Sequence, residues 1–186
     1  MHVMLYGEAP GPRGADQSGI PFWGDRAGAL VYRALAAAGA AEVPESAWVE
    51  WHGGRLRAAG LAPTLYGVGL SNALPVCPTS DGNSFRAPTN AELREPENLR
   101  RVRAELRRAA QSSALDLRVI AFGKRAGWLL EQLREEAGPF ELIVLPHPSS
   151  QGLLAAAKDR GKGAKIAALQ AAWERSLANL LRDGLR

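Results

Sequence analysis

Four short runs of apolar residues recur along the chain, at residues 3–6, 68–71, 119–122 and 142–145. Most of them are unbroken rather than alternating, which is typical of strands buried on both faces of a parallel sheet. Between the runs, apolar positions follow helical spacing, as in residues 27–38, which end before Gly39. Strands that alternate with helices predict an α/β fold, a three-layer sandwich around a central, mostly parallel four-stranded sheet.

Two more helices are predicted from start signals and periodicity. Thr89 and Glu92 have the spacing of a capping box, so a helix should begin there, and Pro96 should break or kink it. Residues 165–181 carry an apolar stripe that is typical of a helix packed on the core. Residues 42–64 hold two tryptophans and a histidine but have no clear pattern, and the sequence does not place them.

Length and composition narrow the class of protein. With 186 residues, of which 46% are hydrophobic and 23% charged, the chain is expected to form a single domain over residues 1–186. It has no signal-like start and no run of ~18 apolar residues, so we expect a cytoplasmic protein without a membrane partner. The single cysteine, Cys77, cannot form an internal disulfide or supply a site of about four ligands, so we expect no metal and no cofactor.

The charge balance permits a polyanionic partner. Lysine and arginine number 23 against 19 acidic residues. One basic cluster, residues 100–108, is interpreted as the solvated face of a helix. The other lies in a glycine-bearing loop and is predicted to contact phosphates through Lys158, Arg160 and Lys162.

Three polar side chains follow predicted strands. Ligands of open α/β sheets bind beyond the carboxyl ends of the strands, and there the sequence has Glu8, Asn72 and His147. Each of them alone is as readily a turn or cap residue, but an acid, an amide and an imidazole at one edge favour a site. The glycines of residues 7–14 follow neither the dinucleotide fingerprint nor the P-loop, so a nucleotide cofactor is disfavoured.

Four motifs in order extend this picture over nearly the whole chain. They are residues 7–11 (Gly-Glu-Ala-Pro-Gly), 19–28 (Gly-Ile-Pro-Phe-Trp-Gly-Asp-Arg-Ala-Gly), 71–77 (Ser-Asn-Ala-Leu-Pro-Val-Cys) and 147–149 (His-Pro-Ser). Together they resemble the motifs of prokaryotic uracil-DNA glycosylases. Glu8 resembles family four, and Asp25 resembles family five. Both families hold an iron–sulfur cluster on four cysteines, whereas Cys77 has no companions, so the resemblance points to a cluster-free branch.

The resemblance implies a monofunctional, metal-free DNA glycosylase that hydrolyses the N-glycosidic bond of uracil or a related deaminated base in DNA. Phe22 would stack on the flipped base, and Asn72 would read its edge, since one amide offers both a donor and an acceptor. Gly7 and Ala9 would complete the base-binding residues.

The resemblance also implies the catalytic residues. His147 would donate a hydrogen bond to the base oxygen that gathers charge. Glu8 or Asp25 would position water. Because Asp25 precedes a helical pattern and could be its N-cap, we expect Glu8 to matter more to the rate.

The stretch after His147 resembles the loop that fills the hole left in the duplex by the flipped nucleotide. Its DNA-contacting residues would be Ser149, Ser150, Gln151 and Leu153, with Gln151 or Leu153 as the wedge. The expected partner is DNA containing a damaged base, bound by a monomer. The alternative is a catalytically silent DNA-binding module that keeps the fold. A small-molecule α/β hydrolase is disfavoured because no Gly-x-Ser-x-Gly elbow is present.

Overall fold

The computed structural model describes residues 2–79, 85–113, 116–158 and 165–185. They fall into two compact units. Residues 1–12 and 67–145 form the sheet unit, and residues 13–66 and 146–186 form the helical unit. Arg160 and Lys162, both predicted DNA contacts, lie outside the described residues.

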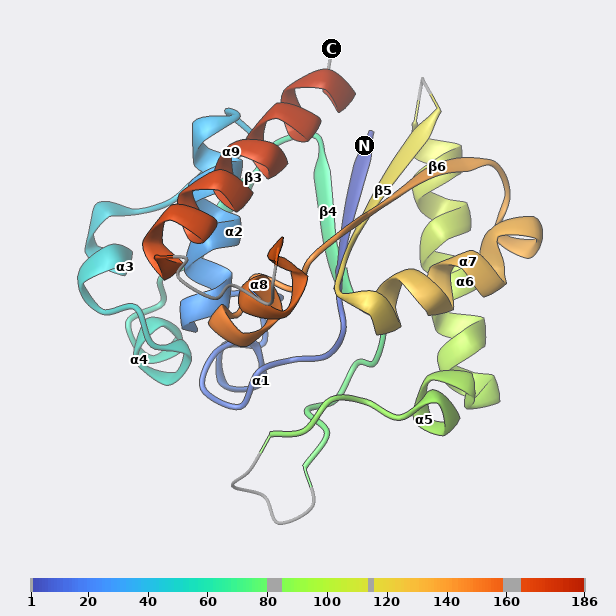
Figure 1. Cartoon of the computed structure of the whole chain (residues 1–186), viewed down its shortest axis with the longest axis horizontal. Helices are drawn as coiled ribbons and strands as arrows, with labels where there is room; N and C mark the ends of the chain where they lie inside the picture. The colour runs from blue at the N-terminus through green and yellow to red at the C-terminus, as the bar shows by residue number, and fades with distance from the viewer. Residues whose placement is uncertain (1, 80–84, 114–115, 159–164, 186) are drawn as a thin grey trace. The chain divides into compact units, whose positions relative to one another are not determined.

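The sheet unit is built on four parallel strands, drawn side by side in Figure 1 in the order β4-β1-β5-β6. Their bounds are β1 Val3–Gly7, β4 Val68–Asn72, β5 Leu117–Phe122 and β6 Phe140–Leu145. Each of them covers one of the four apolar runs. The α/β class and the four-stranded parallel sheet predicted from the sequence are therefore confirmed, and all three strand pairings are parallel.

In its described residues the sheet unit has three helices: α5 Asn90–Arg94, α6 Pro96–Ser112 and α7 Lys124–Ala137. The predicted capping box is present, since the Thr89 side chain accepts from the Glu92 amide and the Glu92 carboxylate accepts from the Thr89 amide. The predicted break at Pro96 is confirmed, because α5 ends at Arg94 and a separate helix, α6, begins at Pro96. Pro96 takes the first position of α6, where its missing N–H leaves no hydrogen bond unmade.

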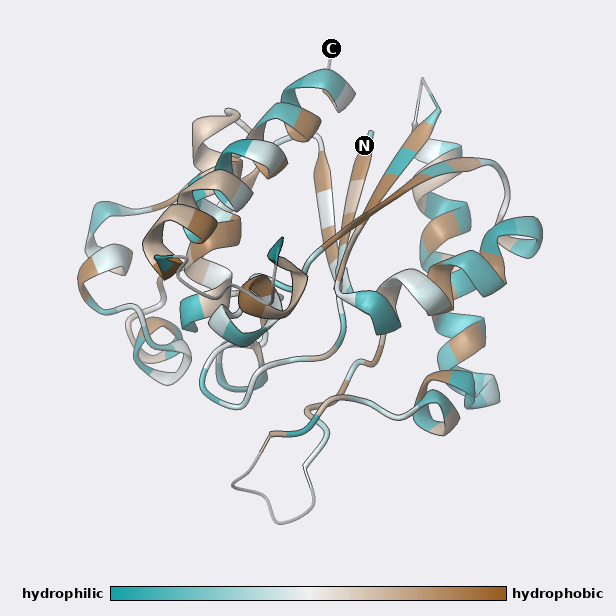
Figure 2. Cartoon of the chain, viewed as in Figure 1, coloured by the Kyte–Doolittle hydropathy of each residue, from teal (hydrophilic) through white to brown (hydrophobic). Residues whose placement is uncertain are grey.

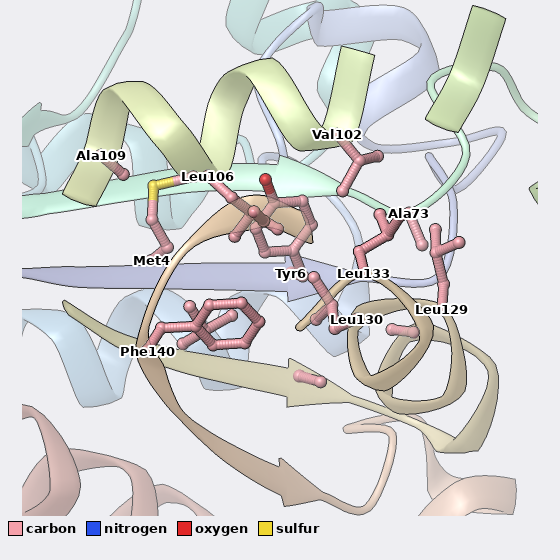
Figure 3. Packing of buried hydrophobic residues seen from close by; sticks show 14 of the residues in the cluster. Met4, Tyr6, Ala73, Val102, Leu106, Ala109, Leu129, Leu130, Leu133 and Phe140 are labelled. Carbon is pink, nitrogen blue, oxygen red and sulfur yellow. The ribbon is translucent and has the colours of Figure 1, made fainter. Parts of the chain in front are cut away.

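The core of this unit lies between the sheet and these helices. Figure 3 shows Met4 and Tyr6 pointing from β1 toward α6, where Val102 and Leu106 meet them. Leu5, on the opposite face of β1, is also fully buried. Burial on both faces explains why β1 and β5 are apolar without alternation, whereas the edge strand β6 has exposed positions. Figure 2 shows the strands mostly in the hydrophobic colours.

The helical unit contains six helices among its described residues, and two long ones, α2 and α9, pack together. Its elements are α1 Ala15–Ser18, α2 Arg26–Ala37, β2 Ala41–Glu42, α3 Glu45–Val49, α4 Gly53–Ala58, β3 Thr64–Leu65, α8 Ser150–Ala156 and α9 Ile166–Gly184. The helices predicted over 27–38 and 165–181 are confirmed. Residues 42–64, which the sequence left unplaced, form α3 and α4 between the two strands of a small antiparallel ribbon.

Candidate active site

Glu8 and Asn72 lie at neighbouring strand ends in the sheet unit. Gly7 is paired with Asn72 in the register of β1 and β4. Pairing continues past the strands, because the Ala73 amide donates to the Gly7 carbonyl at 2.8 Å and the Leu74 amide donates to the Glu8 carbonyl at 2.9 Å. Asn72 is buried, with only 7% of its surface exposed. The sequence-based expectation that the acid and the amide share an edge is confirmed.

The Glu8 carboxylate caps the start of α7. Its Oε1 accepts from the Arg125 amide at 3.1 Å. Gly123, the N-cap residue, has no side chain to do this, and its φ of 96° is one that glycine adopts without strain. A Cβ at Gly123 would collide with Glu8 Oε1. Glu8 therefore satisfies an orphan amide of α7 and places negative charge at the positive end of the helix dipole.

Arg101 holds the backbone around Asn72. Its Nη2 donates to the carbonyls of Asn72 at 2.8 Å and Ala73 at 3.1 Å and to Asn98 Oδ1 at 2.9 Å. Asn98, itself buried, donates to the same Ala73 carbonyl at 2.9 Å. The interpretation of residues 100–108 as a solvated helix face is therefore wrong for Arg101, although Arg100 and Arg108 are exposed. A run of charged residues on a helix does not by itself indicate which side chain packs against the rest of the protein.

Glu105 extends this network to β1 and β4. Its Oε1 accepts from Arg101 Nη1 at 2.7 Å, and its Oε2 accepts from Tyr6 Oη at 2.9 Å and Ser71 Oγ at 2.8 Å. Burial and the nearby Glu105 charge raise the pKa of Tyr6 well above its usual range, so the hydroxyl stays protonated and acts as a donor. The end of β4 is thus fixed by charge-assisted hydrogen bonds on one side.

In the helical unit, one loop carries both Phe22 and Asp25. Phe22 has a φ of 63°, in the left-handed region that bulky residues rarely adopt. Gly28 packs directly against this loop, and a Cβ there would collide with the Phe22 carbonyl oxygen. The Phe22 side chain is partly exposed.

Asp25 is the N-cap of α2, as its position before a helical pattern suggested. Its Oδ1 accepts from the Gly28 amide at 2.7 Å. Burial raises the pKa of Asp25 above its usual value, while the Gly28 amide and the charge of His147 act in the opposite direction. Asp25 and His147 both belong to the helical unit.

The proton of neutral His147 can be assigned from its surroundings. The Ser149 amide donates to His147 Nδ1 at 3.2 Å. Because that nitrogen accepts from a backbone N–H, the proton of the neutral ring is on Nε2. Ser149 also caps α8, since its Oγ accepts from the Gly152 amide at 3.1 Å. The loop thus presents His147 as an Nε2–H donor.

The remaining residues predicted to bind the base or the DNA differ in how far they are exposed to solvent. Ser150, Gln151 and Lys158 are exposed, and Ala9 is partly buried against the core of the sheet unit. Leu153 is 5% exposed, so it contributes to the core, and Gln151 is the accessible one of the two wedge candidates.

The residues present do not fit a four-cysteine iron–sulfur cluster, because the sequence has one cysteine, Cys77. In the ranges that the structure describes, no group of three or more His, Cys, Asp or Glu side chains could hold a metal ion. No helix of those ranges is both long and apolar enough to cross a bilayer.

Comparisons with known proteins identify the family of the chain. A model of the family "Uracil DNA glycosylase superfamily" matches residues 1–175. A type-5 uracil-DNA glycosylase of Thermus thermophilus is 38% identical over 92 residues. That match covers 50% of this chain and 35% of the relative, so the chain spans only about a third of the relative's length. With the family model matching nearly all of its sequence, the chain belongs to the uracil DNA glycosylase superfamily.

Proposed function

We propose that the chain is a DNA glycosylase that hydrolyses the N-glycosidic bond of uracil or a related deaminated base in DNA. One observation carries the proposal: in one unit, the Gly28 amide holds the partly buried Asp25 carboxylate, whose pKa is raised by burial, and the Ser149 amide holds the ring of His147. Carboxylates with a perturbed pKa and histidines are typical of general acid–base sites. Membership of the superfamily supports the same activity.

In the proposed reaction, the bond between C1′ of the sugar and the base nitrogen breaks, and its electron pair leaves with the base. The oxygen of a water molecule bonds to C1′, and the water proton passes to the Asp25 carboxylate. The products are a free base, which takes a proton from solvent, and an abasic sugar. A positioned base of this kind contributes typically ~10²- to 10⁴-fold to a rate.

His147 stabilises the departing base. Its Nε2–H donates a hydrogen bond to the base oxygen that gathers negative charge. Preorganised donors of this kind supply ~3 to 4 kcal/mol in other oxyanion sites. The neutral ring is sufficient for this role, because the Ser149 amide holds the tautomer with Nε2 protonated.

Two further residues recognise the base. Phe22 stacks on it, and stacking of a base on an aromatic ring is worth ~1 to 3 kcal/mol. Asn72 reads its edge with one donor and one acceptor, and the contacts of Arg101 to the Asn72 and Ala73 carbonyls support a fixed orientation for that segment. Gly7, which pairs with Asn72, and Ala9 complete the proposed base-binding residues.

We assign the water to Asp25 in preference to Glu8. The argument for Glu8 was that Asp25 could be only a helix cap, but each carboxylate accepts from an amide at the start of a helix. Capping therefore does not distinguish them. Asp25 belongs to the same unit as His147, whereas Glu8 does not, and the similarity to a type-5 enzyme supports the aspartate.

The proposed DNA contacts are exposed polar and basic residues of the helical unit. Ser150 and Gln151 are the first two residues of α8, and Lys158 follows the helix; Ser149, the N-cap of α8, is only partly exposed. Arg160 and Lys162 remain sequence-based proposals. Gln151 is proposed as the residue that fills the duplex.

The test uses oligonucleotides that each carry one uracil, hypoxanthine, xanthine or mismatched thymine. After incubation with the protein in EDTA, alkali cleaves any abasic site. Strand cleavage at uracil or another deaminated base is expected. Binding to these oligonucleotides without cleavage at any of them would instead identify the silent DNA-binding module, and activity that is lost in EDTA would contradict the metal-free reaction.

A further inference from the structure

The segment that sequence patterns left unplaced contacts the loop that carries Asp25. It runs through α3 and α4 of the helical unit, with Trp51 in the link between them. Trp51 Nε1 donates to the Asp25 carbonyl at 2.6 Å. Two residues further, the Gly53 amide donates to the Arg13 carbonyl at 3.0 Å. The segment from Trp51 to Gly53 therefore hydrogen-bonds to the chain both before the Phe22 loop, at Arg13, and after it, at Asp25.

The second contact also bears on the Asp25 carboxylate. Gly14 follows Arg13, and a Cβ at Gly14 would lie 2.6 Å from Asp25 Oδ2. One carboxylate oxygen is thus bound to the Gly28 amide, and the other lies against the backbone that Gly53 holds. A small displacement of the link between α3 and α4 would move the surroundings of both oxygens.

The orientation of the Trp51 indole is set by neighbouring rings. Trp23 lies 4.8 Å away at 69°, and Tyr32 lies 5.9 Å away at 67°. Both of these side chains are completely buried. Trp48 stacks on the outer side of Trp51 at 4.6 Å and 13°. Edge-to-face packing on a rigid core leaves the indole N–H little freedom to leave the Asp25 carbonyl.

Other side chains hold the carbonyls of the same loop. Tyr32 Oη donates to the Pro21 carbonyl at 3.0 Å, and Ser18 Oγ donates to the Trp23 carbonyl at 2.9 Å. The loop includes Phe22 at a φ of 63°. A residue in this region persists only when its surroundings determine its conformation. The hydrogen bonds to Pro21, Trp23 and Asp25 provide such surroundings.

We propose that Trp51 is a positioning residue, whose indole N–H fixes the backbone of Asp25 and thereby the direction of its carboxylate. The proposal rests on the proposed role of Asp25 in placing water. The segment with α3 and α4 lies outside the four sequence motifs, and the proposal gives it a function: it supports the loop that carries Phe22 and Asp25.

The first experiment compares Trp51→Phe with Trp48→Phe. Trp51→Phe keeps an aromatic ring and removes the N–H donor, whereas Trp48→Phe removes a ring edge from the same stack and no hydrogen bond to the loop. In single-turnover excision of uracil, Trp51→Phe should lower the rate by ~10- to 100-fold, the scale expected when a catalytic group is misplaced by about 1 Å. The Kd for the DNA should change by less than about threefold, and Trp48→Phe should leave both values unchanged.

A double-mutant cycle separates positioning from general destabilisation. In the Asp25→Asn background, Trp51→Phe should lose most of its effect on the rate, because the carboxylate that it positions is gone. The same fold loss in both backgrounds would overturn the proposal. So would a normal rate in Trp51→Phe alone.

A measurement without activity distinguishes failure of this proposal from failure of the proposed function. Hydrogen exchange of the Gly28 amide reports its bond to Asp25 Oδ1. In Trp51→Phe that amide should exchange at least about tenfold faster, while amides of α9 keep their protection. If the wild type excises no base, the proposed function fails, and the exchange data still decide whether Trp51 positions Asp25: unchanged protection of Gly28 overturns it.

Discussion

At the scale of single residues, the two candidate carboxylates have similar local roles and different surroundings. Both accept from an amide in the first turn of a helix, Asp25 at α2 and Glu8 at α7. Burial raises the pKa of Asp25, and Asp25 belongs to the same unit as His147. These surroundings, rather than position in a motif, lead to different expectations for the two variants.

Asp25→Asn should lower single-turnover excision by ~10² to 10⁴ without lowering the melting temperature at about pH 7. Asparagine caps helices about as well as aspartate, so the bond to Gly28 survives the substitution. Glu8→Gln, which also keeps an acceptor for its helix, should lower the rate by a smaller factor. Both rates are measured with the thermal melt of each variant. Loss of excision in Glu8→Gln, with activity retained in Asp25→Asn, would assign the water to Glu8.

The raised pKa of Asp25 predicts a dependence of stability on pH. An aspartate in an unfolded chain titrates near ~3.9, and burial places the folded value above this. Over that interval the folded state binds the proton more tightly, so the stabilising contribution is present at low pH and is lost as pH rises through the folded pKa. Asp25→Asn removes this loss. Its melting temperature relative to wild type should therefore be higher at about pH 7 than at about pH 4, and a difference that is constant with pH would contradict the assignment.

Two substitutions of Phe22 distinguish its contribution to base binding from the strain of its backbone conformation. Phe22→Ala and Phe22→Gly both remove the ring, so both should lose ~1 to 3 kcal/mol of stacking on the flipped base. Only glycine adopts a φ of 63° without strain. Phe22→Gly should thus be more stable than Phe22→Ala by ~1 kcal/mol in denaturant unfolding, with equal defects in excision. Equal stability of the two variants would show that the left-handed conformation is not retained.

At the scale of elements, α7 has a natural matched pair of glycines. Gly123 precedes the helix at a φ of 96°, and Gly138 follows it at 98°. A Cβ at Gly123 would meet the Glu8 carboxylate, whereas a Cβ at Gly138 would meet nothing within 4 Å. An alanine would be strained by the positive φ at either position, but it would collide with a neighbouring side chain only at Gly123.

Gly123→Ala should therefore destabilise the protein more than Gly138→Ala does, by ~1 to 3 kcal/mol, the usual cost of forcing atoms into a packed position. Chemical denaturation of both variants measures the difference. The difference should shrink in a Glu8→Ala background, where the colliding carboxylate is missing. A difference that persists there would mean that the penalty has another source.

At the scale of the whole molecule, the basic residues proposed to contact DNA should differ in their effect on binding from the exposed basic residues of α6. Charge reversal of Lys158, Arg160 and Lys162 should weaken binding to all sequences alike. The slope of log K against log salt should fall by ~0.9 for each phosphate that the variant no longer neutralises. Charge reversal of Arg100 and Arg108, exposed on α6, is the control. Unchanged slopes in the first variant would place the DNA on another surface.

The sequence by itself determined the elements whose signals are local. The four strands, the capping box at Thr89 and the cap at Asp25 depend on residues within one turn or one strand, so each could be predicted without knowing what packs against it. Register also followed in part, because parallel strands place Glu8 and Asn72 at one edge. The ordered motifs supplied the family.

Only the tertiary structure decided which side chains support those motifs. Arg101 and Trp51 lie 29 and 26 residues from the carbonyls that they bind, at Asn72 and Asp25. Glu8 binds the start of a helix 117 residues away. No periodicity or spacing encodes such pairs, because a hydrogen bond across the fold depends on where separate elements pack. The sequence therefore proposed the candidate side chains, and packing decided what holds them in place.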